Sequence, residues 1–127
     1  MKTFPTLLFL LALLWPITGH CRTFQASYYS RASLIKEGTR KANEPQIMAN
    51  GKPFNENAMT CATRDYPLGT LLRIKNKANG RFVVVRVTDR IGKRFKGKRV
   101  DLTKKVFKKL SPLSKGIIFV DIEVISC

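Results

Sequence analysis

A strand–turn–strand pattern between residues 70 and 90 constrains the fold of this chain most. Thr70–Asn76 and Arg81–Val87 are rich in aliphatic and β-branched residues, and Asn79-Gly80 lies between them. This dipeptide between two such runs is the strongest short-range sign of a β-hairpin. The return strand runs on into Asp89 and Arg90, so the hairpin is predicted to end in a carboxylate beside a guanidinium.

Short alternating segments elsewhere predict further strands. Thr23–Ser30 and Ile117–Ile125 alternate apolar and polar residues, and a short extended element is expected at 58–62. We expect one face of the first segment to carry Phe24, Ala26 and Tyr28. One face of the second is expected to carry Ile118, Val120, Ile122 and Val124.

The remaining segments predict loops and one helix. Residues 31–46 are polar and aperiodic, which indicates a long loop with about one helical turn, and 92–98 is a basic, glycine-bearing loop. Thr103 is expected to be the N-cap of a short helix whose apolar side is Val106, Phe107 and Leu110. Many short strands with one small helix predict an all-β barrel.

The first 22 residues have the pattern of a secretory signal peptide. Lys2 precedes an apolar run, 7–15, that is too short to span a bilayer, which needs about 20 residues. Residues 23–127 then form one domain of about 105 residues. We expect export to the periplasm, the cell envelope or the medium. Lipid attachment at Cys21 is disfavoured, because His20 stands where a small residue is usual.

Charge points to an anionic partner. The chain has 24 Lys and Arg residues against 8 Asp and Glu, a formal net charge of +16. For an exported protein this favours a wall polymer or a membrane surface. Nucleic acid is disfavoured, because no basic motif interleaved with aromatic residues is present. No cofactor or metal is expected, since His20 is the one histidine and the cysteines lack paired spacing.

The three cysteines leave the redox state open. If Cys21 is removed with the signal peptide, Cys61 and Cys127 remain, and an oxidising compartment favours a disulfide between them. The alternative is two free, buried thiols.

Several motifs occur together in an order and spacing that resemble those of the rare lipoprotein A (RlpA) family. The similarity covers nearly all of residues 23–127. It implies a six-stranded double-psi β-barrel, a fold shared with expansins. The motifs are Ala26-Ser27-Tyr28-Tyr29, Ala49-Asn50-Gly51, Asn57-Ala58-Met59-Thr60, Pro67-Leu68-Gly69-Thr70, Asn79-Gly80-Arg81, Val83–Arg90 and Gly97–Thr103.

The resemblance also implies a reaction. Active members of the family are endolytic peptidoglycan transglycosylases, which cut between N-acetylmuramic acid and N-acetylglucosamine without water and leave 1,6-anhydro ends. The family carries four polar site positions, Glu, Asp, His and Asp. This chain has Lys52, Asn55 and Thr63 at the first three and keeps the fourth as Asp89. Asp89 is therefore the expected catalytic residue, acting as both acid and base.

Other residues are expected to bind the substrate, as the resemblance places them near the groove. Asp101 is interpreted as structural, holding the turn into the short helix. The residues expected to contact the glycan are Tyr28, Tyr29, Lys52, Asn55, Glu56, Thr63 and Arg90.

Two functions are best supported at this point. The first is a lytic transglycosylase acting on peptidoglycan glycan strands. The second is an expansin-like wall-binding module with weak or no activity, which the changes at Lys52, Asn55 and Thr63 favour. The basic segment 93–99 offers a contact for other anionic wall polymers in either case. A cationic secreted effector acting on a membrane or host polymer is a third, less supported hypothesis.

Overall fold

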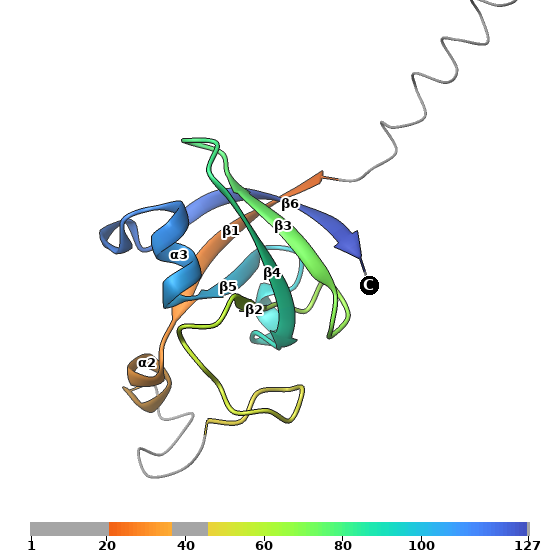
Figure 1. Ribbon diagram of the computed structural model, residues 1–127, viewed down its shortest axis with the longest axis vertical. Helices are drawn as coiled ribbons and strands as arrows, with labels where there is room; N and C mark the ends of the chain where they lie inside the picture. The colour runs from red at the N-terminus through yellow and green to blue at the C-terminus, as the bar shows by residue number, and fades with distance from the viewer. Residues whose placement is uncertain (1–20, 37–45, 127) are drawn as a thin grey trace, which may run out of the picture.

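The protein is a closed barrel of six strands with one helix packed beside it (Figure 1). The computed structural model describes residues 21–36 and 46–126. Going round the barrel, the strand order is β1-β5-β2-β4-β3-β6. The strands are β1 (Cys21–Tyr29), β2 (Thr60–Ala62), β3 (Leu71–Asn76), β4 (Phe82–Asp89), β5 (Arg99–Thr103) and β6 (Ile118–Ser126).

The sheet mixes parallel and antiparallel pairs. β1 runs parallel to β5 and β2 runs parallel to β4, whereas the other neighbours are antiparallel. Parallel neighbours require long crossover connections. The barrel therefore brings together segments that lie far apart in the sequence, and β1 and β6, near opposite ends of the chain, are direct neighbours.

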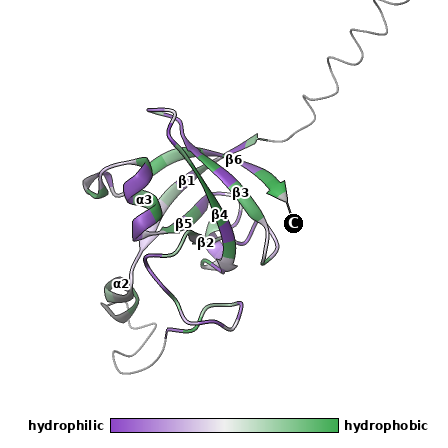
Figure 2. Ribbon diagram, viewed as in Figure 1, coloured by the Kyte–Doolittle hydropathy of each residue, from purple (hydrophilic) through white to green (hydrophobic). Residues whose placement is uncertain are grey.

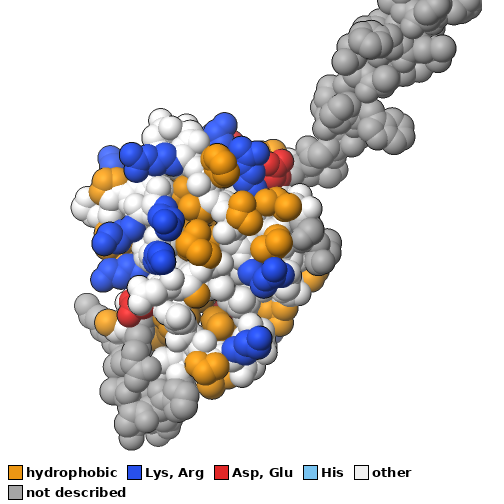
Figure 3. Space-filling view, in the orientation of Figure 1, with side chains coloured by type: hydrophobic (Ala, Val, Ile, Leu, Met, Phe, Trp, Pro, Cys, Tyr) orange, Lys and Arg blue, Asp and Glu red, His pale blue; other side chains and the backbone are white. Residues whose placement is uncertain are grey.

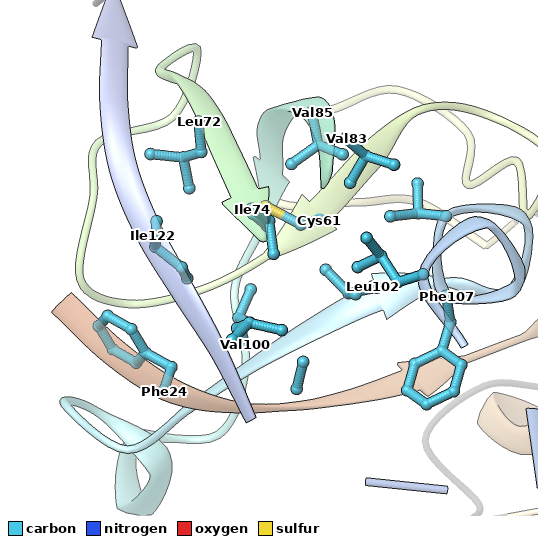
Figure 4. Packing of buried hydrophobic residues seen from close by; sticks show 14 of the residues in the cluster. Phe24, Cys61, Leu72, Ile74, Val83, Val85, Val100, Leu102, Phe107 and Ile122 are labelled. Atoms are coloured by element: carbon cyan, nitrogen blue, oxygen red, sulfur yellow. The ribbon is translucent and has the colours of Figure 1, made fainter. Parts of the chain in front are cut away.

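The core fills the inside of the barrel with aliphatic and aromatic side chains (Figure 4). Phe24, Ile74 and Leu102 contribute from three different strands, and all are almost completely buried. Figure 2 shows that the strands alternate in hydropathy while α3 (Lys104–Leu110) is mostly hydrophilic. α3 joins the core through three fully buried side chains, Val106, Phe107 and Leu110, which are those predicted for its apolar side.

The predicted hairpin and helix are confirmed. β3 and β4 pair antiparallel with Ile74 opposite Val83, and Gly80 in the connecting turn has a φ of 77°. A positive φ is readily adopted by glycine, which has no Cβ. Thr103 caps α3, because its hydroxyl accepts a hydrogen bond from the Val106 N–H at 3.3 Å.

Three elements differ from the sequence-based expectation. β5 covers residues 101–103, where the start of a helix was expected. α2 (Arg31–Lys36) is a six-residue helix, longer than the single turn foreseen. β1 begins at Cys21, because Cys21 and Arg22 still pair with β6. Residues 1–20 lie outside the described part, so the signal peptide stays a prediction.

The apolar face predicted for β6 is buried over most of its length. Ile118, Val120 and Ile122 are buried, but Val124 is 46% exposed. The pairing of β3 with β6 shifts register between Leu71 and Leu72, next to Val124. A bulge of this kind disrupts the inward–outward alternation at the strand end. Among the described residues, no helix is long and apolar enough to cross a membrane.

Candidate functional site

A groove of about 780 Å³ lies at the ends of β1, β2, β4 and β5. The predicted residues Tyr28, Tyr29, Asp89 and Arg90 all line it. The segment that follows Asp89 forms one wall, including Lys93 to Phe95. The groove therefore collects the end of the predicted hairpin and the end of the first strand in one place.

Asp89 is held at the end of β4 by its first carboxylate oxygen. Oδ1 accepts hydrogen bonds from the backbone N–H groups of Ala49 at 2.9 Å and Arg90 at 2.8 Å. Within the described residues, Oδ2 accepts one long hydrogen bond, from the Tyr29 hydroxyl at 3.5 Å. One oxygen is thus fixed by the backbone, while the other has capacity to exchange a proton with a ligand in the groove.

Tyr29 forms a buried support beneath this carboxylate. Its side chain is 7% exposed, and its ring stacks on Phe54 with 4.6 Å between centroids. Burial, with the nearby Asp89 charge second, raises the pKa of the Tyr29 phenol well above its ordinary value. The phenol therefore stays protonated and donates to the Asp89 carboxylate.

The segment before β2 packs against the Asp89 end of β4. Asn50 donates its N–H to the Thr88 carbonyl at 3.1 Å, and the Thr88 hydroxyl lies 3.3 Å from the Met48 sulfur. Ile47 and Pro53 form a β-bridge that closes this segment into a small hairpin. Asp89 thus joins the loop to the barrel through the Ala49 N–H.

Asp101 brings a second carboxylate to the same groove. It lies on β5, and the Ser27 hydroxyl donates a hydrogen bond to its Oδ1. Ala62 on β2 is the register partner of both Asp89 and Asp101. Because neighbouring strands lie about 4.8 Å apart, the two aspartate Cα atoms are separated by about 10 Å. The small, buried Ala62 forms the floor between them.

The sequence of this barrel matches that of a known family. The sequence profile described as lytic transglycolase matches residues 22–122. The chain belongs to this family. Its relatives include a protein of Nostoc sp. named probable endolytic peptidoglycan transglycosylase RlpA, 38% identical over 103 residues. That match covers 81% of this chain and 27% of the relative.

A second relative agrees with the first. The endolytic peptidoglycan transglycosylase RlpA of Campylobacter jejuni is 36% identical over 77 residues, covering 61% of this chain and 28% of the relative. The chain thus spans about a quarter to a third of the length of these curated relatives. The predicted similarity to the RlpA family is confirmed.

Solved structures confirm the double-psi β-barrel. The Streptomyces papain inhibitor superposes with a TM-score of 0.62 at 21% identity, covering 84% of this chain and 96% of its own. A Clavibacter michiganensis expansin in complex with cellohexaose gives 0.59 at 19% identity, covering 84% and 50%. At these identities the likeness establishes the fold, and the six strands are those the resemblance implied.

The family's three other polar positions do not line the groove, although the Thr63 backbone N–H donates to the Asp89 carbonyl at 3.1 Å. Thr63 is buried, and its hydroxyl accepts the Asp65 N–H at 3.1 Å. Asn55 accepts the Asn57 N–H at 2.9 Å in a turn, and Lys52 is exposed on the loop before it. None of these three side chains lines the groove. Their proposed contacts with substrate remain predictions.

Glu56 lies in a different hollow of about 640 Å³ beside α3. Its walls are Asn57 and four lysines, namely Lys104, Lys105, Lys108 and Lys109. Figure 3 shows basic side chains gathered over the α3 side of the molecule. Glu56 therefore belongs to the basic face of the helix, and its predicted role in glycan binding is untested.

Arg90 and Tyr28 line the groove but also have structural partners. The Arg90 guanidinium donates to the carbonyls of Thr63 at 2.7 Å and Tyr66 at 2.6 Å. The Tyr28 ring packs 4.8 Å from that of Phe107. Arg90 thereby fixes the segment after β2, and Tyr28 fixes α3, against the groove.

Cys61 is a fully buried thiol in the barrel core. Burial, with the Asp101 charge second, raises the pKa of the Cys61 thiol to about 12. Its predicted disulfide partner, Cys127, lies outside the described residues, so the disulfide stays a prediction. Within the described ranges, no group of three His, Cys, Asp or Glu side chains could hold a metal ion.

Sequence reasoning missed Asp101 and Ala62 as groove residues. The segment Arg99–Thr103 alternates polar and apolar residues, and Val100 and Leu102 are buried as a strand requires. That alternation was the available signal. It would have placed Asp101 on the outward face of a strand instead of at a helix start.

Proposed function

We propose that this chain is an exported lytic transglycosylase that cuts peptidoglycan between N-acetylmuramic acid and N-acetylglucosamine, leaving 1,6-anhydro ends. The observation that carries the proposal is the asymmetric holding of Asp89. Two backbone N–H groups fix Oδ1, while Oδ2 has one long hydrogen bond from a protonated Tyr29. A carboxyl group oriented in this way can give up and take back one proton at a fixed position in the groove.

One carboxyl group is enough for this reaction. Protonated Asp89 donates its proton from Oδ2 to the glycosidic oxygen as the bond from that oxygen to the muramic acid C1 breaks. Positive charge develops at C1. The 6-hydroxyl of the same sugar then forms the new C1–O6 bond and transfers its proton to the Asp89 carboxylate. No water is consumed, whereas hydrolysis would use a second carboxylate to activate water or to attack C1.

Asp101 supplies electrostatic stabilisation in this proposal. It lies two strands from Asp89, across Ala62, and the Ser27 hydroxyl orients it. A fixed negative charge near the sugar favours the positive charge that develops at C1. Replacing Asp101 should therefore slow cleavage while leaving Asp89 in position.

The substrate class is supported by the relatives and by the neighbouring structure. The two RlpA relatives described above are named as peptidoglycan transglycosylases, and the expansin neighbour holds a cellohexaose. The α3 lysine face supports a weaker second contact, with anionic polymers of the wall. Adhesion through that face should weaken in salt, because exposed charges are screened.

A non-catalytic wall-binding module is the second candidate. It is favoured by Lys52, Asn55 and Thr63, which stand where the family is expected to carry Glu, Asp and His and which do not line the groove. In this alternative the same groove binds the glycan without cutting it.

Product analysis separates the two candidates. Glycan strands stripped of stem peptides are incubated with the purified chain and with Asp89→Asn, and the products are identified by mass spectrometry. We expect 1,6-anhydro ends from the first and not from the second. Asp121→Asn is the matched control, because Asp121 lies outside the groove and accepts the Thr23 hydroxyl. Intact strands in all samples, with a control enzyme cutting them, would favour the binding module.

A further inference from the structure

The Asp89 groove continues into two further hollows on the outside of the barrel. A hollow of about 600 Å³ shares Arg94, Phe95 and Arg99 with the groove. A third, of about 580 Å³, shares Thr23 and Phe119 with the second. Since each hollow has walls in common with the next, the three form one furrow that leads away from Asp89.

The floor of this furrow is the outward face of β1. Ser27 lies in the Asp89 groove, Gln25 in the second hollow and Thr23 in the second and third. The alternate residues, Phe24 and Ala26, point into the core. From residue 29 to residue 23 the strand advances six steps, or about 20 Å at 3.3 Å per residue. That length suits a chain of several sugar rings.

Neighbouring strands build the two sides of the furrow. Gln25 is the register partner of Arg99 on β5 and of Phe119 on β6. These three outward side chains therefore form a row across the furrow. The Arg99 guanidinium also reaches the Gln25 side-chain oxygen at 3.4 Å, which ties the two polar members of the row together.

The side chains along the furrow suit a glycan. Phe119 is 56% exposed, and the Phe95 ring has the Arg94 and Arg99 guanidinium carbons each 4.6 Å from its centroid. Aromatic rings can cover the C–H faces of sugars, while amide and guanidinium groups bond hydroxyl and acetamido groups. The Arg99 Nε donor is buried and makes no hydrogen bond within the described part of the chain.

We propose that this furrow is an extended glycan-binding site in which Phe119 contacts a sugar ring remote from the Asp89 cleavage position, while Arg94 and Arg99, which lie over the Phe95 ring, donate to sugar hydroxyl and acetamido groups. The inference rests on the proposed function for the identity of the ligand. It adds that the domain recognises an oligosaccharide along β1, so that affinity should rise with the number of sugars until the Phe119 end is reached.

Binding of N-acetylglucosamine oligomers tests the furrow. The full chain carrying Asp89→Asn is titrated with the disaccharide and with the hexasaccharide by calorimetry, so that cleavage does not interfere. We expect the hexasaccharide to bind at least tenfold more tightly than the disaccharide. Adding Phe119→Ala should weaken hexasaccharide binding by about fivefold to tenfold and leave disaccharide binding unchanged.

Phe82→Ala is the matched control. Phe82 is also an exposed phenylalanine, at 53%, and also has an arginine over its ring, but it lies on β4 outside the furrow. This variant should change neither the disaccharide nor the hexasaccharide affinity. The furrow is refuted if Phe119→Ala binds the hexasaccharide like its parent, if both oligomers bind equally, or if neither binds. Cleavage is scored separately with Asp89 intact. If 1,6-anhydro products form but Phe119→Ala leaves hexasaccharide affinity unchanged, the proposed function stands and the furrow is rejected. If Phe119→Ala weakens hexasaccharide binding but no anhydro products form, the furrow stands and the proposed function is rejected.

Discussion

Asp89 should have two separable roles, one in the chemistry and one in holding the loop that contains Ala49. Asp89→Asn keeps a carbonyl oxygen where Oδ1 now accepts the Ala49 and Arg90 N–H groups, but it removes the proton-exchanging carboxyl. Asp89→Ala removes both the acceptor and the carboxyl. The two variants should therefore be equally inactive but differ in stability.

The expected magnitudes follow from these two hydrogen bonds. A hydrogen bond to a charged group contributes about 1.5–3 kcal/mol when buried, and Asp89 is only partly buried, so water replaces part of each loss. We expect Asp89→Ala to lower the free energy of unfolding by about 2 kcal/mol, and Asp89→Asn by less than about 1 kcal/mol. For a domain of this size 2 kcal/mol corresponds to about 10 °C in Tm.

Two assays on the same variants test this reasoning. Thermal unfolding followed by circular dichroism gives the stability difference, and release of 1,6-anhydro products gives activity. Loss of an acid–base group should reduce cleavage by about 100-fold to 10,000-fold in both variants. Asp121→Ala controls for the loss of a half-buried carboxylate that has an ion pair with Lys77, and it should change stability by less than about 1 kcal/mol. An Asp89→Ala protein as stable as Asp89→Asn would refute the loop-holding role, and cleavage by Asp89→Asn at the parent rate would refute the chemical one.

Smaller predictions concern the supports around the groove. Arg90→Ala should cost about 2 kcal/mol in urea unfolding, because the guanidinium bonds two backbone carbonyls in the segment after β2; a cost near zero would show that water replaces it. Thr103→Ala should cost about 2 kcal/mol, because it removes both the α3 cap and the hydroxyl's hydrogen bond to the Ala58 carbonyl, and Thr103→Ser should recover most of it; a serine variant as unstable as the alanine variant would argue against both roles of the hydroxyl. In the reduced full-length chain, with the predicted signal peptide still attached, iodoacetamide at pH 8 should label the exposed Cys21 and spare the buried Cys61, whose thiol stays protonated below its raised pKa of about 12. Equal labelling of both cysteines would contradict a closed core around Cys61.

The hairpin and the capped helix could be predicted because their signals are local. Asn79-Gly80 specifies a tight turn, and the polar–apolar pattern on either side sets which residues face inward. Thr103 carries its own capping hydroxyl. Each of these elements is determined by residues within a few positions of one another.

β5 was missed because its place is set by distant partners. The segment Arg99–Thr103 is short, follows a basic loop and leads directly into α3, so its ending looks like a helix start. It becomes a strand by pairing in parallel with β1, more than 70 residues away in the sequence. Parallel pairing of this kind leaves no turn signal that a local pattern could show.

The candidate site was also predictable only where its signal is local. Asp89 stands out because it ends a clear strand, and the resemblance marks it independently. Asp101 becomes a groove residue only through the register that sets Ala62 between β4 and β5. Conversely, Thr63 is taken out of the groove by burial, which no single-sequence pattern around it foretells.

The adjacency of β1 and β6 has a consequence for biogenesis. Until residues 118–126 have been synthesised, β1 and β3 each lack a neighbour, so the barrel cannot close around its core. A nascent or translocating chain therefore remains open, with two unpaired strand edges available to chaperones. If the chain is exported as proposed, this topology delays folding until the last strand has emerged on the far side of the membrane.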